Sequence, residues 1–110
     1  MSGSPTFQVL HYLTPSGTDV YEDWLRGLDS RDAERIKAYV TRMYSGNFGV
    51  TRSVGEGVFE LKINFGPGYR LYYLHDGDRI VVLLCGGDKG YQTRDIAQAK
   101  RSAGDYWRRK

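Results

Sequence analysis

The chain has 110 residues, the length of one domain with a single hydrophobic core. Apolar residues make up 40% and charged residues 26%, a balance that excludes a wholly disordered or collagen-like chain. Residues 1–40 carry six acidic and four basic residues (−2), whereas residues 41–110 carry seven acidic and twelve basic residues (+5). This uneven charge indicates a polyanionic or acidic partner for the second part of the chain.

The sequence also favours a cytoplasmic protein. Its longest apolar run, Ile80–Cys85, is far shorter than the roughly 20 residues of a membrane span. The first residues lack a basic segment followed by an apolar one, so we expect no secretory signal, and residues 1–5 are expected to be frayed. A single cysteine cannot form an internal disulfide, which suits a reducing compartment. We therefore expect one domain, residues 1–110, with no membrane partner.

The first half of the chain predicts a strand followed by two helices. Residues 7–13 alternate loosely and read as a strand. Asp19, with Glu22 three residues later, is typical of a helix start. The apolar spacing i, i+3, i+4, i+7 then defines one buried face, formed by Tyr21, Trp24, Leu25 and Leu28. Ser30 is expected to cap a second helix that ends at Gly46, and the short connection at 27–29 predicts an antiparallel helical hairpin.

After Gly49 the hydrophobic period becomes that of strands. Residues 50–54 alternate before a turn, and 58–64 place Glu60 and Lys62 on the face opposite the apolar residues. A turn at 65–68 leads to a strand at 69–75 and then to a continuous apolar strand at 79–85, which should be covered on both faces. A last helix begins near Thr93, and the residues expected to face inward are Ile96, Ala99, Ala103 and Trp107. We summarise the fold as α+β, in the order β-α-α-β-β-β-α, with a small, mainly antiparallel sheet packed by the helical hairpin and the C-terminal helix.

Several kinds of site can be set aside. His11 and His75 lie far apart with no cysteine at ligand spacing, so no metal site is expected. Cys85 ends the central apolar run and reads as a buried packing residue. The glycines do not have the spacing of a phosphate-binding loop, so we expect no cofactor.

Charged residues on the central strands are the remaining candidates. Antiparallel pairing through the turn at 65–68 brings Lys62 close to Arg70, and Glu60 lies on the same face. Arg52 and Lys89 can join the same basic surface. The simpler interpretation is a solvated sheet face with an ion pair between Glu60 and Lys62. The alternative is a surface that binds a phosphodiester.

Metal-free RNA cleavage requires three groups: a base for the 2′-hydroxyl proton, a cation for the developing phosphorane charge, and an acid for the leaving 5′-oxygen. Glu60 or a lysine can supply the base, and Arg70 the cation. Lys89, Tyr91 or a water can supply the acid. DNA lacks the 2′-hydroxyl, so such a site would be selective for RNA.

Four segments together resemble the RelE/ParE superfamily of bacterial toxins, and within it the HigB-like "addiction module killer" branch. They are GVFELK ending at Lys62, GPGYR ending at Arg70, LLCGGDK ending at Lys89, and the Q-x-x-D-I-x-x-A pattern of residues 92–99. The resemblance runs over residues 50–107, and the preceding helical hairpin fits the same fold. It implies a microbial-RNase-like fold and the toxin of a type II toxin–antitoxin module.

The resemblance implies an endoribonuclease that cleaves mRNA on the ribosome and inhibits translation. By position, Lys62, Arg70 and Lys89 match basic residues of the family. Tyr91 is the first candidate for the counterpart of a C-terminal tyrosine, and Tyr106 is the second. Glu60 departs from the pattern, because the best-studied members carry a second lysine on this strand. The candidate catalytic residues are Arg70, Lys62, Glu60, Lys89 and Tyr91. The candidate RNA-binding residues are Arg52, Arg70, Lys89 and Arg94.

Two other functions stay open at this point. The chain could be a ParE-like inhibitor of DNA gyrase, or an antitoxin-binding module without catalytic activity. In each case the resemblance implies a cognate antitoxin, a small helix-turn-helix protein, whose acidic or amphipathic segment covers the basic face. For the nuclease, the further partners are mRNA and the ribosome.

Overall fold

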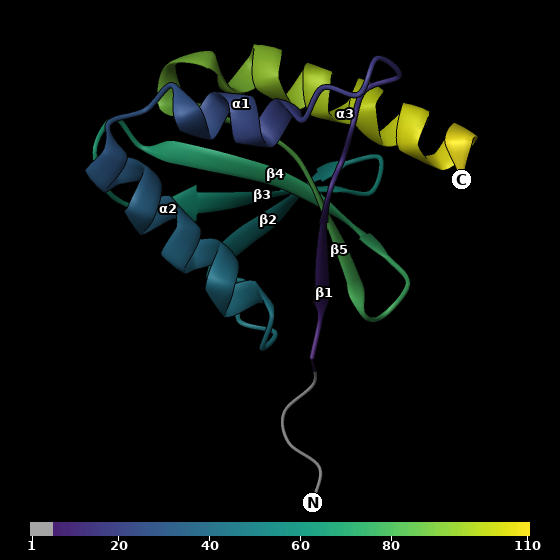
Figure 1. Ribbon diagram of the computed structural model, residues 1–110, viewed down its shortest axis with the longest axis horizontal. Helices are drawn as coiled ribbons and strands as arrows, with labels where there is room; N and C mark the ends of the chain where they lie inside the picture. The colour runs from purple at the N-terminus through teal and green to yellow at the C-terminus, as the bar shows by residue number, and fades with distance from the viewer. Residues whose placement is uncertain (1–5) are drawn as a thin grey trace, which may run out of the picture.

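The structure is a computed structural model that describes residues 6–110, so the expected fraying of residues 1–5 lies outside it. A central sheet is covered by helices on both faces (Figure 1). The elements follow one another as β1 (Gln8–His11), α1 (Val20–Arg26), α2 (Ser30–Met43), β2 (Val50–Gly55), β3 (Val58–Ile63), β4 (Tyr69–Asp76), β5 (Ile80–Asp88), the short 3-10 helix η1 (Lys89–Tyr91) and α3 (Gln92–Arg109). The α+β class is confirmed. Four strands separate α2 from α3, one more than the summarised order has, although the alternation of residues 50–54 did predict the first of them, β2.

The five strands are arranged in the order β1-β5-β4-β3-β2. Strands β2 to β5 form an antiparallel meander, and β1 alone pairs in parallel, with β5. The predicted turn at residues 65–68 joins β3 to β4, and residues 77–79 join β4 to β5. β5 lies inside the sheet with residues 81–85 buried, as its continuous apolar sequence predicted.

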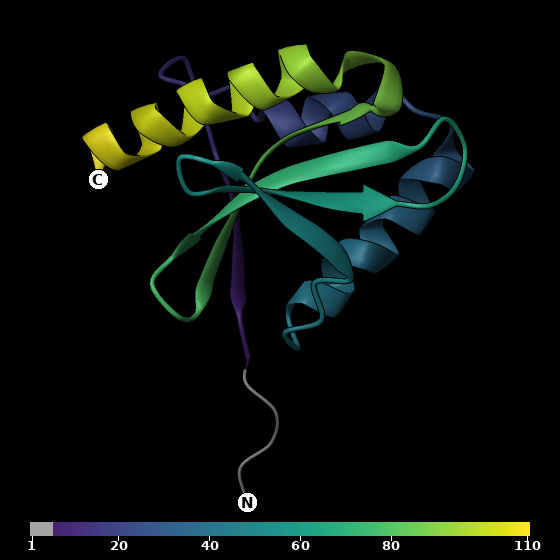
Figure 2. The same ribbon diagram turned by 180° about the vertical axis from the view of Figure 1, so that it is seen from behind.

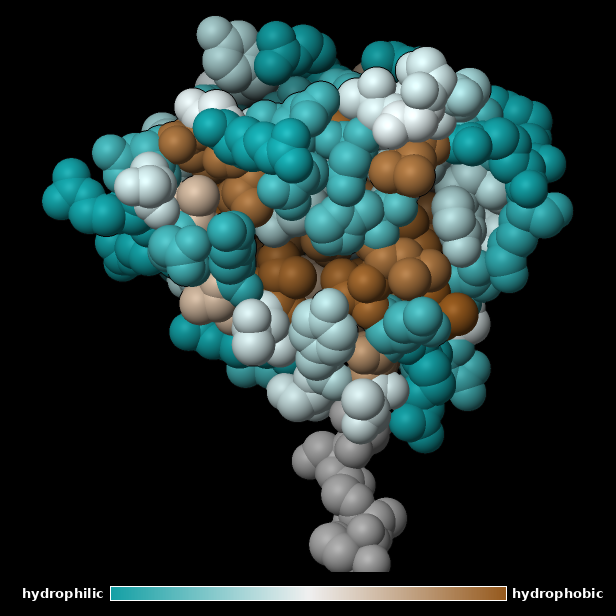
Figure 3. All heavy atoms as spheres, viewed as in Figure 1, coloured by the Kyte–Doolittle hydropathy of each residue, from teal (hydrophilic) through white to brown (hydrophobic). Residues whose placement is uncertain are grey.

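Helices α1 and α2 pack on one face of the sheet. Asp19 caps α1 by accepting a hydrogen bond from the Glu22 backbone N–H at 3.0 Å. The predicted cap of α2 was wrong by one residue: Asp29 accepts from the Arg31 N–H at 2.9 Å, and Ser30 is the first helical residue. Figure 1 shows the two helices as the arms of a V rather than side by side. The apolar side chains in the middle of this face are visible between the polar ones in Figure 3.

Helix α3 packs on the opposite face (Figure 2). Ala99 and Ala103 are buried and Ile96 is partly buried, as predicted. The expectation for Trp107 was wrong, since its side chain is 44% exposed. Tyr106, not Trp107, packs against the core at this end of the helix. Within residues 6–110, no helix is both long and apolar enough to span a lipid bilayer.

Two adjacent glycines near the end of β5 let helices approach both faces of the sheet. A Cβ atom on Gly86 would lie 2.3 Å from the Trp24 ring of α1, and one on Gly87 would lie 1.9 Å from Asp95 Oδ2 of α3. Neighbouring strand residues point to opposite faces, which explains why the two contacts come from opposite sides. The Gly86-Gly87 pair therefore fixes both helices near the candidate site, and any larger residue would displace one of them.

Candidate functional site

A groove of about 290 Å³ lies over strands β2, β3 and β4 at the start of α3. We call it the cation groove, and its lining consists of Val50, Thr51, Arg52, Glu60, Lys62, Arg70 and Gln92. The strand register creates it in two rows: Arg52, Glu60 and Tyr72 lie opposite one another, as do Val50, Lys62 and Arg70. The sheet therefore brings together three of the cations that the sequence suggested.

Glu60 is the hub of the first row. Its Oε1 accepts a hydrogen bond from Arg52 Nε at 2.8 Å, and its Oε2 accepts from Tyr72 Oη at 2.9 Å and from Gln92 Nε2 at 3.0 Å. Only 3% of the residue is exposed. Burial alone would raise the pKa of Glu60, but the hydrogen bonds from these three donors outweigh it and hold the pKa below its ordinary value. Glu60 is therefore a buried carboxylate that organises its neighbours.

Arg70 is held rigidly in the second row. Its guanidinium Nη1 donates to the backbone carbonyls of Gly68 at 3.0 Å and Tyr69 at 3.2 Å. Its Nε lies 3.8 Å from Glu60 Oε1 and is buried without a hydrogen-bond partner among the residues described. Because the side chain is only 7% exposed, the charge is fixed at the edge of the groove rather than free in solvent. Such a preorganised cation can stabilise an anion with little rearrangement.

Lys62 is the solvent-exposed lysine of the groove. Its backbone pairs with Arg70, which confirms the predicted proximity of these two residues, and its side chain is exposed. Within residues 6–110 it makes no ion pair. The interpretation as a solvated face with a Glu60–Lys62 pair was wrong, because Glu60 is buried and its partners are Arg52, Tyr72 and Gln92. The groove thus holds three cations against one carboxylate.

Three further predicted residues lie just after β5, and none of them lines the groove. Lys89 lies close to Arg70: a Cβ atom on Gly68 would be 3.4 Å from Lys89 Cβ and 3.5 Å from Arg70 Nη1. Tyr91 is 55% exposed, and the Arg94 guanidinium lies 4.3 Å from the centre of its ring. Asp88, whose carboxylate accepts from the Gly90 N–H at 2.8 Å, shapes this segment.

Two residues that donate hydrogen bonds to Glu60 were missed from the sequence. Tyr72 lies two residues after Arg70 on the same face, so the period of the strand was a usable signal. Gln92 belongs to the Q-x-x-D pattern, but its contact with Glu60 depends on how α3 docks on the sheet. Asp95, in the same pattern, is buried over Gly87 with Oδ2 unpartnered among the residues described, and burial raises its pKa.

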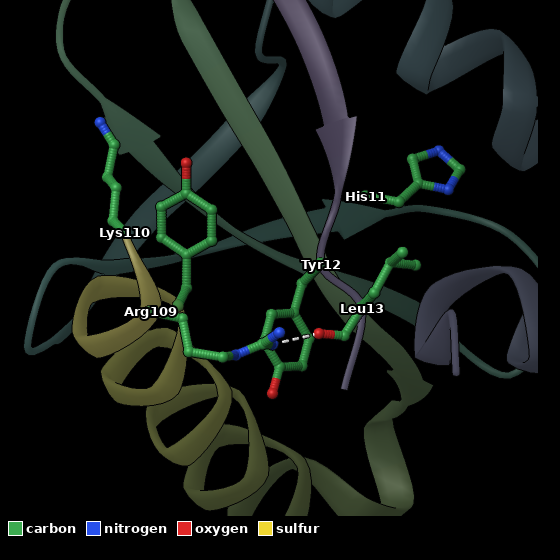
Figure 4. Close-up of a pocket in the computed structure, with 6 residues that line it drawn as sticks. His11, Tyr12, Leu13, Arg109 and Lys110 are labelled. Carbon is green, nitrogen blue, oxygen red and sulfur yellow. Dashed lines mark hydrogen bonds between the residues drawn. The ribbon is translucent and has the colours of Figure 1, made fainter. Parts of the chain in front are cut away.

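A second cavity of about 230 Å³ lies between the end of β1 and the end of α3, and we call it the C-terminal hollow (Figure 4). The guanidinium of Arg109 lies over the ring of Tyr12 and donates to the Leu13 carbonyl. Arg109 also donates to Asp105 at 2.8 Å. Lys110 pairs with Asp76 at 3.0 Å. Each cation here has a carboxylate partner, so the hollow anchors the end of α3.

The thiol of Cys85, a potential nucleophile, is buried. Cys85 lies in the core on the α3 side, and burial raises the pKa of its thiol to about 12, as befits a packing residue. Among residues 6–110, no group of three histidine, cysteine or acidic side chains is arranged to hold a metal ion.

The five-stranded, mostly antiparallel sheet and the helices on its two faces are compatible with a RelE-like fold. Residues 23–103 match the family described as phage-derived protein Gp49-like (DUF891). The chain therefore belongs to this family, which is a toxin–antitoxin toxin family of the RelE/Gp49 type. It is also similar to an uncharacterised protein of Haemophilus influenzae, with 45% identity over 84 residues, which are 76% of this chain and 85% of the relative. Membership of this family implies an antitoxin partner.

Proposed function

We propose that the chain is a metal-independent endoribonuclease of the HigB-like branch, which cleaves mRNA on the ribosome and so inhibits translation in the cytoplasm. The observation that carries this proposal is the convergence of Arg52, Lys62 and Arg70 on one groove that contains a single carboxylate. A groove with excess positive charge is suited to bind a phosphodiester and to stabilise the additional negative charge of a phosphorane.

The reaction begins with attack of the ribose 2′-oxygen on the adjacent phosphorus. Lys62 first releases its own proton to water and then accepts the 2′-hydroxyl proton as the O2′–P bond forms. Arg70 and Arg52 stabilise the charge on the phosphorane oxygens. The P–O5′ bond then breaks, and the leaving oxygen takes a proton from Lys89. The products are a 2′,3′-cyclic phosphate and a 5′-hydroxyl end.

We assign the base to Lys62 rather than Glu60 because both Glu60 oxygens already accept hydrogen bonds and its pKa is lowered. Glu60 acts as a positioning residue that orients Arg52 and ties Gln92 to the sheet. Lys89 is preferred to Tyr91 as the acid because its stem lies beside the Arg70 guanidinium, whereas the Tyr91 ring is covered by Arg94.

The test is to map mRNA 5′ ends in cells after induction of the wild type, Lys62→Gln and the matched control Lys110→Gln. The wild type and the control should produce new 5′-hydroxyl ends at codon positions, whereas Lys62→Gln should reduce them about 100-fold. Lys62 is exposed, so its replacement should leave the thermal unfolding midpoint unchanged. If Lys62→Gln still cleaved mRNA fully, Lys62 would not be the base. Intact mRNA with DNA damage after wild-type induction would favour a gyrase inhibitor instead.

We further propose that the antitoxin is a small helix-turn-helix protein whose acidic segment covers the cation groove. The excess of cations in the groove supports an acidic occupant. Replacing Lys62 by Glu should weaken antitoxin binding, measured by titration calorimetry, at least tenfold, and the same change at Lys110 should have little effect. If the antitoxin bound both variants with equal affinity, it would bind outside the cation groove.

A further inference from the structure

The outward face of α3 carries arginines that the proposed chemistry does not use. Arg94, Arg101 and Arg108 are seven residues apart, so they lie within about 40° of one another around the helix and about 10 Å apart along it. All three are exposed. Ala97 and Gly104 lie between them on the same face. We call these five residues the α3 stripe.

Acidic side chains neutralise the arginines of the stripe only weakly. Arg101 has no acidic partner within residues 6–110, and Arg94 and Arg108 make only long contacts with Asp95 at 3.4 Å and Asp105 at 3.8 Å. Both of these carboxylates lie away from the stripe: Asp95 is buried, and Asp105 is hydrogen-bonded in the C-terminal hollow. The Arg101 guanidinium is therefore free to face a ligand, and the Arg108 guanidinium is held only by its 3.8 Å contact, whereas the Arg94 guanidinium also lies 4.3 Å from the centre of the Tyr91 ring.

A shallow cavity of about 580 Å³ extends along the stripe, on the side of α3 that carries Lys100 and Arg101. The β2–β3 turn, which supplies Glu56 to it, lies beside α3 in Figure 2. Its lining consists of Glu56, Ala97, Lys100, Arg101, Gly104 and Arg108. Lys100 contributes a fourth cation, and its 3.5 Å pair with Glu56 supplies the cavity's one acid. The cavity thus combines a concave surface with a net positive charge.

Gly104 gives an independent indication that something approaches this face closely. A glycine inside a helix is less stable there than alanine. The fold does not require it: a Cβ at this position would meet only the flexible Arg108 side chain, at 3.4 Å. A glycine between cations does, however, leave room for a ligand backbone to reach the helix.

The composition of the stripe favours a polyanion over a protein. Protein interfaces rely on large apolar or aromatic anchors, and none of the five stripe residues is one. Single-stranded nucleic acids stack their bases on aromatic rings, whereas the five stripe residues include none and the neighbouring Tyr91 ring already has the Arg94 guanidinium over it. A duplex hides its bases and presents phosphates, and phosphates are the groups that regularly spaced arginines bind.

We propose that the α3 stripe binds the phosphate backbone of duplex RNA and so docks the toxin on structured ribosomal RNA. This inference rests on the proposed function. Gln92, at the start of α3, lines the cation groove, and the stripe begins two residues later at Arg94. One rigid helix therefore connects the docking surface to the site of cleavage and fixes their relative orientation.

The test measures binding of the full chain to a fluorescent RNA hairpin with a 16-base-pair stem, by anisotropy over a range of salt concentrations. All proteins carry Lys62→Gln, so cleavage does not enter the measurement. Changing both Arg101 and Arg108 to Gln should weaken binding at least tenfold and lower the salt slope by about 1 for each arginine. The matched control changes Arg31 and Lys37 to Gln, which removes the same charge from α2 and should leave binding within about twofold.

Gly104→Ala separates binding from folding. It should raise the thermal unfolding midpoint, because alanine favours the helix, and at the same time weaken RNA binding severalfold. Unchanged RNA binding by Gly104→Ala and by the double arginine variant would overturn the proposal. Equal or tighter binding to a DNA duplex of the same length would overturn the assignment to RNA. Stripe-dependent RNA binding by a chain that cleaves no mRNA in cells would reject the proposed nuclease while retaining the docking surface.

Discussion

The cation groove and the C-terminal hollow are built from the same kinds of residue but have different electrostatic character. The groove places Arg52, Lys62 and Arg70 around one carboxylate, that of Glu60. In the hollow, two cations meet two carboxylates, because Arg109 pairs with Asp105 and Lys110 with Asp76. Basic residues alone therefore do not define a binding site, because nearby carboxylates can neutralise them.

The difference arises from how each set is positioned. Lys62 and Arg70 lie opposite each other on adjacent strands, so the backbone ladder keeps like charges together. Such an arrangement destabilises a sheet unless an anion compensates. In the hollow, Asp105 precedes Arg109 by one helical turn, which is the favourable spacing for an ion pair. The groove therefore retains unsatisfied charge for a ligand, and the hollow uses its charge to fix the helix end.

The largest expected difference between the cation groove and the C-terminal hollow is the loss of cleavage when one arginine is replaced in each. Arg70→Ala should lower mRNA cleavage by about 10²–10³-fold, because a preorganised cation beside the phosphorane is lost. Arg109→Ala should leave cleavage unchanged and lower the thermal midpoint, since it releases the end of α3. Cleavage is measured by counting 5′-hydroxyl ends, and circular dichroism checks that both variants fold. Equal losses of cleavage in the two variants would mean that the groove and the hollow do not differ in their contribution to cleavage.

An intermediate effect is expected when each region loses a carboxylate. Glu60→Gln should destabilise the protein by about 1–3 kcal/mol, because the hydrogen bonds from Arg52 and Tyr72 lose their charged acceptor. It should lower cleavage only about tenfold, as expected of a positioning residue. Asp105→Asn should give a smaller loss of stability and no change in cleavage. If Glu60→Gln abolished cleavage as completely as Arg70→Ala does, the base would be Glu60.

The smallest effect is a difference in acid sensitivity. Hydrogen bonds hold the pKa of Glu60, despite its burial, and of Asp105, where Tyr12 donates, below their ordinary values. Carboxylates with lowered pKa values stabilise the fold at neutral pH, and this stabilisation is lost as the pH falls below about 4.5 and through the folded-state values. Urea unfolding from pH 7 to pH 2.5 should therefore show a shallower decline for Glu60→Gln than for the wild type. A parallel decline would mean that Glu60 does not stabilise the folded state through its charge.

Much of the fold could be predicted because its signals are local. The alternation of residues 58–64 and the turn at 65–68 correctly gave the β3–β4 hairpin, and the apolar run of β5 correctly gave a strand covered on both faces. The errors concern helix ends and packing. The identity of the α2 cap, the divergence of α1 and α2, and the exposure of Trp107 depend on contacts that no short window of sequence contains.

In the candidate site, too, local features could be predicted from the sequence, whereas contacts between distant segments could not. Lys62 and Arg70 could be brought together from the sequence because hairpin pairing follows from a short turn. The burial of Glu60 and its contact with Gln92 could not, because Gln92 comes from a helix 32 residues further along the chain. The burial of Glu60 also changed its expected chemistry, from a possible base to an organising carboxylate.

By itself, the sequence determined the α+β class, the order of strands along the hairpins, and which two cations face each other across β3 and β4. Hydrophobic periodicity and turn residues act over a few positions, so they specify such features directly. Only the tertiary structure decided which charges are neutralised and which remain available. That outcome depends on where α3 lies on the sheet, and this is fixed by the close contact of Asp95 with Gly87 together with the apolar packing around Ala99.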